Sequence, residues 1–113
     1  MTSAKKCSLA WSDFQENAGV TFCYLREDQD FCDVTLVCED NQQIPGHKVV
    51  LASSSQLLKA LLKSNPHIHP FLYLWGIKAR DMTRIVDFIY TGQVQVYQSD
   101  LQDFLTLAEL LQV

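Results

Sequence analysis

The stretch FCDVTLVCEDNQQIPGHKVVLASSS, residues 31–55, decides the fold of this chain. Successive residues from Val34 onward would point to opposite faces of a strand, and Asp40-Asn41 suits a tight hairpin turn. The return strand, residues 43–47, contains Pro45, which places that strand at a sheet edge or a bulge because proline cannot donate a ladder hydrogen bond. From residue 49 the apolar spacing is helical, and the serines at 53–55 predict a break into two short helices.

Two features of this stretch look chemical: the acid Asp33 ahead of the first strand, and the His47-Lys48 pair at the junction between strand and helix. Catalysis needs a nucleophile, a base and an orienting group within hydrogen-bond reach, and the chain has no G-x-S-x-G elbow. His67 and His69 supply only two ligands for a metal ion. We therefore expect no catalytic residue, no metal and no cofactor, and we expect His47 to satisfy buried backbone groups.

Apolar residues are dense near the N-terminus. Residues 7–11 are a strand candidate, and Ser12 and Gln15 have the spacing of a capping box at the start of a helix. This region has more apolar surface than one core-facing helix stripe requires. The excess is either buried within one chain or used as a subunit interface. The residues concerned are Leu9 and Trp11, followed at helical spacing by Phe14, Ala18, Phe22 and Leu25.

The second half of the chain predicts two more strands and two more helices. Residues 71–75 form a nearly continuous apolar run that suits a buried strand. Residues 79–91 have apolar side chains at helical spacing, with Gly92 where a C-terminal cap belongs. Residues 93–97 predict a short strand, and Ser99 would cap a last helix. The fold class is therefore α+β, with the hairpin and residues 71–75 in one sheet that helices cover.

The composition limits the possible functions. A chain of 113 residues is one domain, and a formal charge of −4, with Lys5-Lys6 as its one adjacent basic pair, argues against direct nucleic-acid binding. No apolar run approaches the ~20 residues that a membrane helix needs. The cysteines at 7, 23, 32 and 38 form no C-x-x-C pair and follow no secretory signal, so we expect reduced thiols in an intracellular protein. The helical pattern of residues 105–113 suggests a domain cut from a longer protein.

Taken together, these segments resemble a BTB/POZ domain. The resemblance covers nearly the whole chain and rests on residues 31–55, on FIYTGQV at 88–94 and on LQDFLTLAELLQV at 101–113. The N-terminal CSLAWSDFQENAGVTF, residues 7–22, is similar to the extension found in the Tramtrack-type insect subgroup. The resemblance implies a BTB/POZ fold, in which a helical cluster is flanked by a small sheet and an N-terminal strand and helix form a dimer interface. It implies no enzymatic activity.

The resemblance also implies roles for particular residues. A single domain, 1–113, would consist of a dimerisation strand and helix, residues 1–27, and a core, residues 28–113. Asp33 and Lys48 match the acid and the base of a charged pocket at the dimer floor. His47, Tyr90 and Gly92 are expected to be structural. The dimer or oligomer interface would contain Leu9, Trp11, Phe14, Ala18, Phe22 and Leu25.

The expected function is protein–protein interaction. The chain would form homodimers, and larger homo-oligomers, for a nuclear DNA-binding regulator of transcription or chromatin architecture, and would bind other BTB or co-regulator proteins. The DNA-binding modules would lie outside this chain, which would contact neither nucleic acid nor membrane. The alternative is a substrate adaptor for a cullin-type ubiquitin ligase. Such adaptors usually carry an acid in the loop before the third strand, and SNPHIHP, residues 64–70, has none.

Overall fold

The predicted hairpin forms two strands of a three-stranded sheet. The computed structural model describes residues 4–113. Strand β1 (Val34–Val37) pairs antiparallel with β2 (Gln43–Gly46) and parallel with β3 (Phe71–Tyr73), which gives the order β2-β1-β3. Asn41 takes a left-handed φ of 62° in the turn, and Pro45 lies on an edge strand. The hairpin, its turn and the edge position of Pro45 are confirmed.

The helices follow the predicted order along the chain. They are α1 (Phe14–Glu27), α2 (Lys48–Ser54), α3 (Gln56–Ser64), α4 (Ala79–Thr91) and α5 (Leu101–Leu110), with a 3-10 turn, η1 (Gln98–Asp100), before α5. The predicted break between α2 and α3 is present at Ser55, whose hydroxyl accepts the backbone N–H of Leu58 at 3.0 Å. The same hydroxyl donates to the carbonyl of Leu111, which fastens the start of α3 to the end of α5.

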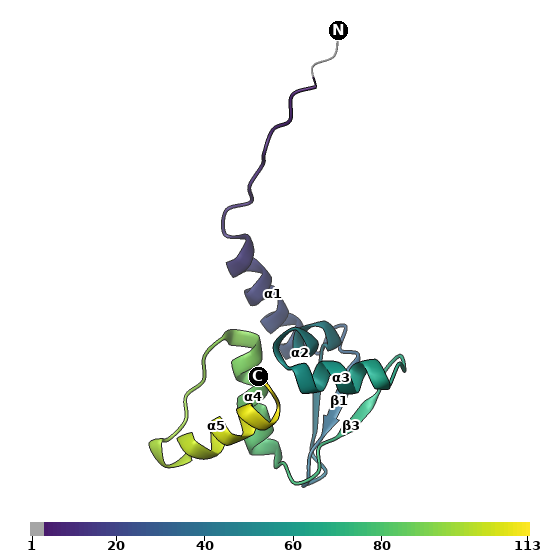
Figure 1. Ribbon diagram of the computed structural model, residues 1–113, viewed down its shortest axis with the longest axis vertical. Coiled ribbons are helices and arrows are strands. Elements are labelled where there is room, and N and C mark those ends of the chain that lie inside the picture. Colours follow the sequence, from purple (N-terminus) through teal and green to yellow (C-terminus); the bar gives the residue numbers. More distant parts are fainter. Residues whose placement is uncertain (1–3) are drawn as a thin grey trace.

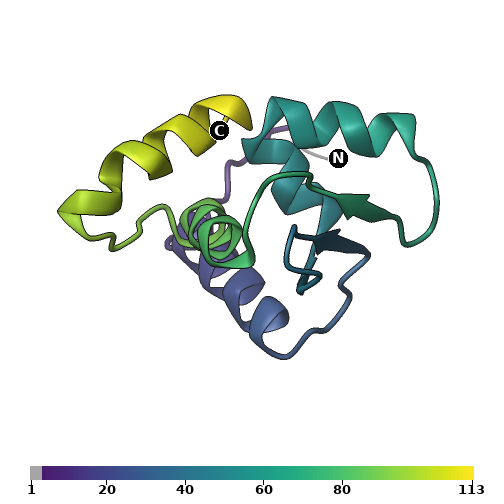
Figure 2. The ribbon, with the colours of Figure 1, turned by 90° about the horizontal axis from the view of Figure 1, so that it is seen from below.

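The core lies between one face of the sheet and α4. Leu36 of β1 and Met82 and Ile85 of α4 are fully buried, and leucines of α2 and α3 complete the cluster. Helix α4 packs against α1 and α5, and Figure 2 shows it end-on between them. The small sheet and the surrounding helices confirm the predicted α+β class. Figure 1 shows the N-terminal segment projecting from this body.

Two segments predicted as strands are not strands in the described chain. Residues 7–11 and 93–97 belong to no sheet, because β1, β2 and β3 pair only with one another. The predicted helix caps near these segments are also wrong. Helix α1 begins after Asp13, which has a left-handed φ of 65° and no side-chain capping bond, so Ser12 and Gln15 form no capping box. Ser99 lies inside η1 and does not cap α5.

Strand β3 differs from its prediction in length and burial. It ends at Tyr73, and only Leu72 among its three residues is buried. The prediction of a buried strand at residues 71–75 is wrong because β3 is an edge strand, and the core cluster includes Leu72 but neither Phe71 nor Tyr73.

Candidate interaction surface

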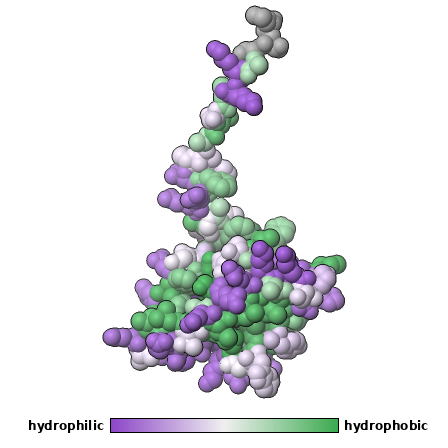
Figure 3. All heavy atoms as spheres, in the orientation of Figure 1, coloured by the Kyte–Doolittle hydropathy of each residue, from purple (hydrophilic) through white to green (hydrophobic). Residues whose placement is uncertain are grey.

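The N-terminal segment carries large apolar side chains that do not pack on the body of the domain. Leu9 is 98% exposed, Trp11 67% and Phe14 54%. The rings of Trp11 and Phe14 lie 5.2 Å apart and contact each other. Figure 3 shows hydrophobic residues along this projecting segment. Exposed apolar groups of this density are typical of a surface that another protein covers.

The other three predicted interface residues lie on the side of α1 that faces the body. Ala18, Phe22 and Leu25 are half-buried, and Phe22 packs against the core with its ring 6.1 Å from the ring of His47. The predicted stripe is thus divided, since its first half is exposed and its second half anchors the helix.

The opposite side of α1 is open, and the predicted set of interface residues did not include it. Val20 and Tyr24 are both more than half exposed there. A Cβ placed on Gly19 would have no heavy atom within 4 Å, so no close approach within this chain requires a glycine. Since these residues lie outside the apolar stripe, only the docked position of α1 shows that they are exposed.

Helix α1 is held in place through its last turns. The guanidinium of Arg26 forms an ion pair of 2.8 Å with Asp87 of α4, and it lies 5.1 Å from the centre of the Tyr90 ring. The thiol of Cys23 donates to the carbonyl of Tyr90 at 3.5 Å. These contacts fix the C-terminal half of α1 on α4 and leave its N-terminal half to extend beyond the body.

His47 and Tyr90 form the buried polar centre of the domain. The ring Nε2 of His47 lies 2.8 Å from the carbonyl of Asp30, and because a carbonyl only accepts, Nε2 carries the proton. In the neutral ring Nδ1 then accepts the Tyr90 hydroxyl proton at 2.7 Å, while the backbone N–H of His47 donates to the same hydroxyl oxygen at 2.9 Å. Every polar atom of the pair is satisfied, so His47 has no free nitrogen for general-base chemistry.

Burial controls the ionisation of the neighbouring groups. It raises the pKa of Tyr90 to about 12, and the hydrogen bond from the backbone N–H of His47 lowers this pKa by a smaller amount. Burial, reinforced by the charge of Asp33, also raises the pKa of the Cys32 thiol, which lies 3.8 Å from Nε2 of His47. A protonated thiol is a poor nucleophile, so this cluster does not support catalysis by Cys32.

Asp33 and Lys48 lie close together, but their side chains do not form an ion pair with each other. The carboxylate of Asp33 accepts the backbone N–H of Lys48 at 2.7 Å and so satisfies a free donor at the start of α2. The ammonium of Lys48 donates to the carbonyl of His67 at 2.6 Å. Sequence reasoning found both residues but not this geometry, because the capping side chain comes from a different element.

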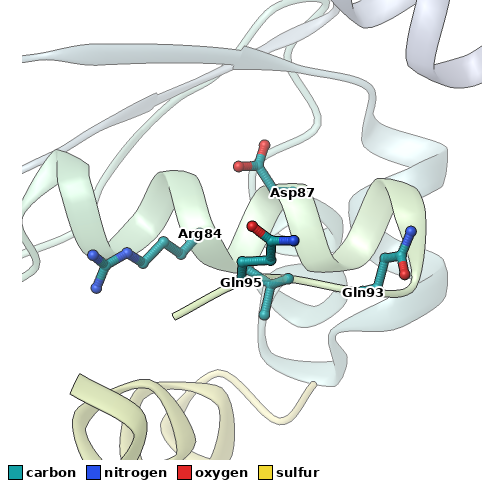
Figure 4. A pocket seen from close by; sticks show the side chains of 5 residues that line it. Arg84, Asp87, Gln93 and Gln95 are labelled. Atoms are coloured by element: carbon teal, nitrogen blue, oxygen red, sulfur yellow. The ribbon is translucent and has the colours of Figure 1, made fainter. Parts of the chain in front are cut away.

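A shallow hollow of about 440 Å³ lies beside α4 and the segment that follows it (Figure 4). Its charged side chains already have partners, since Asp87 pairs with Arg26 and Arg84 lies 3.4 Å from Asp100. The amides of Gln93 and Gln95 line the rest, together with Val94. Such a lining suits hydrogen bonds to a polypeptide better than the binding of a charged small molecule.

The described residues contain no metal site and no membrane helix. Within residues 4–113, no group of three or more His, Cys, Asp or Glu side chains is placed to hold a metal ion. No helix in the same range has both the length and the apolar character to cross a bilayer. The features that stand out are therefore the exposed apolar surfaces.

Comparison with known proteins identifies the family of this fold. The family model described as BTB/POZ domain matches residues 22–113. Two relatives from Drosophila melanogaster are Protein abrupt, 42% identical over 106 residues, and Transcription activator GAGA, 34% identical over 106 residues; each match covers 94% of this chain. The matched region is only 12% of Protein abrupt and 18% of Transcription activator GAGA.

A solved structure shows the same fold. The BTB (Tramtrack and Bric a brac) domain of human gigaxonin is 32% identical to this chain and superposes with a TM-score of 0.74, over 95% of this chain and 89% of that chain. The family match covers most of the sequence, and the sheet and helices agree with it. The chain therefore belongs to the BTB/POZ domain family.

Proposed function

We propose that this BTB/POZ domain forms a homodimer through residues 4–27 and so brings together two copies of a nuclear DNA-binding regulator of transcription or chromatin architecture. The observation that carries this proposal is the uncovered apolar surface of Leu9, Trp11 and Phe14, which continues on the open side of α1. Covering it with a second chain removes that surface from water, which is the main driving force for association.

The backbone gives a second reason for pairing between two copies. Residues 7–11 and residues 93–97 were both predicted as strands, and in the described chain neither segment belongs to a sheet. Among the described residues, no backbone hydrogen bond is made by residues 94–96. Residues 7–11 of one copy are proposed to pair with residues 94–96 of the other, beside the hollow of Figure 4. Each segment then supplies the neighbouring strand that the other lacks.

The rest of the assignment follows from charge and from the relatives. The net charge of −4 disfavours contact with phosphates, so DNA binding is assigned to regions outside this chain. The name of Transcription activator GAGA supports a role in transcription and with it a nuclear location. Linking two DNA-binding modules by a dimer raises avidity by ~10²–10⁴ without any new DNA contact. Other BTB domains and co-regulator proteins are proposed as further partners.

The proposed dimer also gives a place for Asp33 and Lys48. Lys48 is the first residue of α2, and Asp33, in the segment that connects α1 to β1, reaches its backbone N–H. They are proposed to line a charged pocket at the dimer floor, where each side chain could meet groups of the second copy in addition to its partner within the chain.

The test is the mass of the chain by light scattering at a few micromolar, a concentration that favours the strongest contact. Phe14→Glu places a charge in the proposed interface at a helix start that tolerates an acid. We expect the unmodified chain to be a dimer and Phe14→Glu to be a monomer with an unchanged circular dichroism spectrum. Leu110→Lys, which changes an exposed leucine of α5, is the control and should remain a dimer. A dimer that survives Phe14→Glu would refute the proposed interface.

A further inference from the structure

The sheet has a second face whose side chains lie outside the core. The strand register places Pro45, Thr35 and Phe71 in one row on this face, and Gln43, Val37 and Tyr73 in the next. None of them belongs to the core cluster, although Thr35 and Val37 are only 7% and 5% exposed and the Thr35 hydroxyl lies 2.7 Å from Nε2 of His69. Phe71 is 51% exposed and Tyr73 76%, and Trp75, just after the strand, is almost fully exposed. The result is an aromatic margin along β3.

The backbone of β3 is also open on its outer side. Hydrogen bonds from Thr35 N–H to the Pro70 carbonyl (3.1 Å) and from Leu74 N–H to the Val37 carbonyl (2.8 Å) show which groups of this segment face β1. Because backbone groups alternate along a strand, the N–H and C=O groups of Phe71 and Tyr73 point away from β1. Strand β3 ends the sheet on this side, so no other strand of the described chain pairs with them.

This edge has little of the protection that free strand edges usually carry. Exposed edges are commonly blocked by charged side chains, especially lysine, that oppose pairing with another strand. Residues 66–77 contain no Asp, Glu, Lys or Arg. An uncharged edge beside exposed aromatic rings can accept an added strand.

We propose that β3 pairs with the β3 of a second copy of this chain, antiparallel and around a two-fold axis at Leu72. In that register Phe71 of one copy lies opposite Tyr73 of the other, and these are the two residues whose N–H and C=O groups point outward. Each Phe71–Tyr73 pair exchanges both of its backbone hydrogen bonds, and Leu72 lies at the non-bonded position between the pairs. The edge is therefore complementary to itself, as a two-fold interface requires.

The side chains fit the same register. Phe71 and Tyr73 point to the same face, so the pairing brings an aromatic ring from each copy next to one from the other. No two like charges meet, because the paired segment has no Asp, Glu, Lys or Arg. A strongly acidic or basic peptide would gain no ion pair from residues 66–77, which favours a second copy as the occupant.

This contact builds on the proposed dimer without overlapping it. The dimer would use the projecting N-terminal segment, while Figure 1 shows β3 at the far side of the body. Dimers joined through β3 would therefore form tetramers or larger assemblies. The expected size of the assembly depends on the proposed N-terminal dimer. The β3 contact itself does not, because two monomers could also pair through β3.

Light scattering from micromolar to several hundred micromolar tests the proposal. We expect the mass of the unmodified chain to rise above that of a dimer as concentration increases. Tyr73→Pro removes an outward-pointing N–H and no hydrogen bond within the chain, and proline is tolerated at such an edge position. It should stay a dimer, as should Tyr73→Lys, which keeps the backbone and adds a charge. Leu110→Lys should associate like the unmodified chain.

The two contacts can be separated in the same experiment. Phe14→Glu should still associate through β3 at high concentration, and Phe14→Glu combined with Tyr73→Pro should be a monomer throughout. If Phe14→Glu changes nothing but Tyr73→Pro lowers the mass, the proposed dimer interface fails and the β3 contact stands. Two results would refute the β3 contact. In the first, the mass of the unmodified chain never rises above that of a dimer, and Phe14→Glu reduces it to that of a monomer. In the second, neither Tyr73 variant lowers the mass.

Amide hydrogen exchange separates strand pairing from contact between side chains alone. The N–H groups of Phe71 and Tyr73 should exchange quickly in dilute samples and at least tenfold more slowly in concentrated ones. The N–H of Leu74, already bonded to β1, should change much less. Association that leaves the exchange of Phe71 and Tyr73 unaltered would refute the proposed pairing of strands.

Discussion

Replacing Tyr90 by phenylalanine removes a single oxygen atom from the centre of the domain. That oxygen accepts the backbone N–H of His47 and donates to its ring Nδ1, at 2.9 and 2.7 Å, and both partners are buried. Tyr90→Phe keeps the ring and its packing but leaves a donor and an acceptor of His47 without a partner. Each buried unsatisfied group costs about 1–3 kcal/mol. We expect a total loss of about 2–6 kcal/mol, which lowers Tm by roughly 10–25 °C in a domain of this size.

The assay is thermal and urea unfolding, with all variants at one concentration because association changes apparent stability. Tyr97→Phe is the matched control, since Tyr97 is exposed and its removal leaves no buried group without a partner. It should change the free energy of unfolding by less than about 0.5 kcal/mol. A Tyr90→Phe domain as stable as the Tyr97→Phe domain would refute the role assigned to the Tyr90 hydroxyl.

The same variant predicts a pH dependence. The pKa of Tyr90 is raised from 10.0 to about 12 in the folded domain, so folding favours the protonated phenol. The resulting stabilisation is complete below pH 10 and is lost as the pH rises from 10 to 12. Tyr90→Phe cannot lose this contribution, so the difference in stability between it and the unmodified domain should narrow across that range. The difference for Tyr97→Phe serves as the baseline, and an equal narrowing for both variants would contradict the assignment.

Three further predictions concern the N-terminal surface and the start of α2. Asp33→Ala should lower the free energy of unfolding by about 1–2 kcal/mol, because it removes a helix-capping hydrogen bond. Because the side chains of Asp33 and Lys48 are not paired, the effects of Asp33→Ala and Lys48→Ala should add within ~0.5 kcal/mol. A larger coupling energy in a double-mutant cycle would show that the two side chains interact. Leu9→Asp should lower the mass measured by light scattering, and an unchanged mass would exclude Leu9 from assembly. Deleting residues 1–27 should cause aggregation measurable by turbidity, whereas deleting residues 1–12 should leave a folded domain; a soluble, folded 28–113 fragment would contradict the packing of α1 on the core.

Local sequence signals predicted most of the elements. Two local signals were enough to predict the hairpin: side chains that alternate between the two faces of a strand, and a turn residue that tolerates a left-handed φ. Asn41 is that turn residue. The C-terminal end of α4 was predicted from one glycine, and Gly92 has the left-handed φ of 78° expected of a C-terminal cap. These features depend on residues close together in the chain, so the sequence carries them directly.

Features that depend on distant residues were not predictable. Tyr90 lies 43 positions from His47, and nothing local indicates that its hydroxyl completes the hydrogen bonding of that histidine. In the same way, Asp33 satisfies the first turn of a helix on the other side of the hairpin. Which side of α1 is exposed depended on how that helix docks, through Arg26 and Asp87, rather than on its apolar spacing.

Apolar composition also led to wrong predictions of burial and of strand pairing for three segments. Residues 71–75 were predicted to be buried because they are apolar, yet Tyr73 and Trp75 are exposed. Residues 7–11 and 93–97 have strand-like patterns but no neighbouring strand in the described chain. In each case the apolar pattern alone does not show whether the same chain supplies a neighbour for the segment.

Sedimentation equilibrium of the unmodified chain tests self-association most directly, because it gives the mass in solution without any substitution. One chain has a mass of 12.9 kDa. From about one micromolar upward, we predict a mass at least twice that value. A mass of 12.9 kDa that persists to a hundred micromolar would contradict the central claim that residues 4–27 bind a second copy.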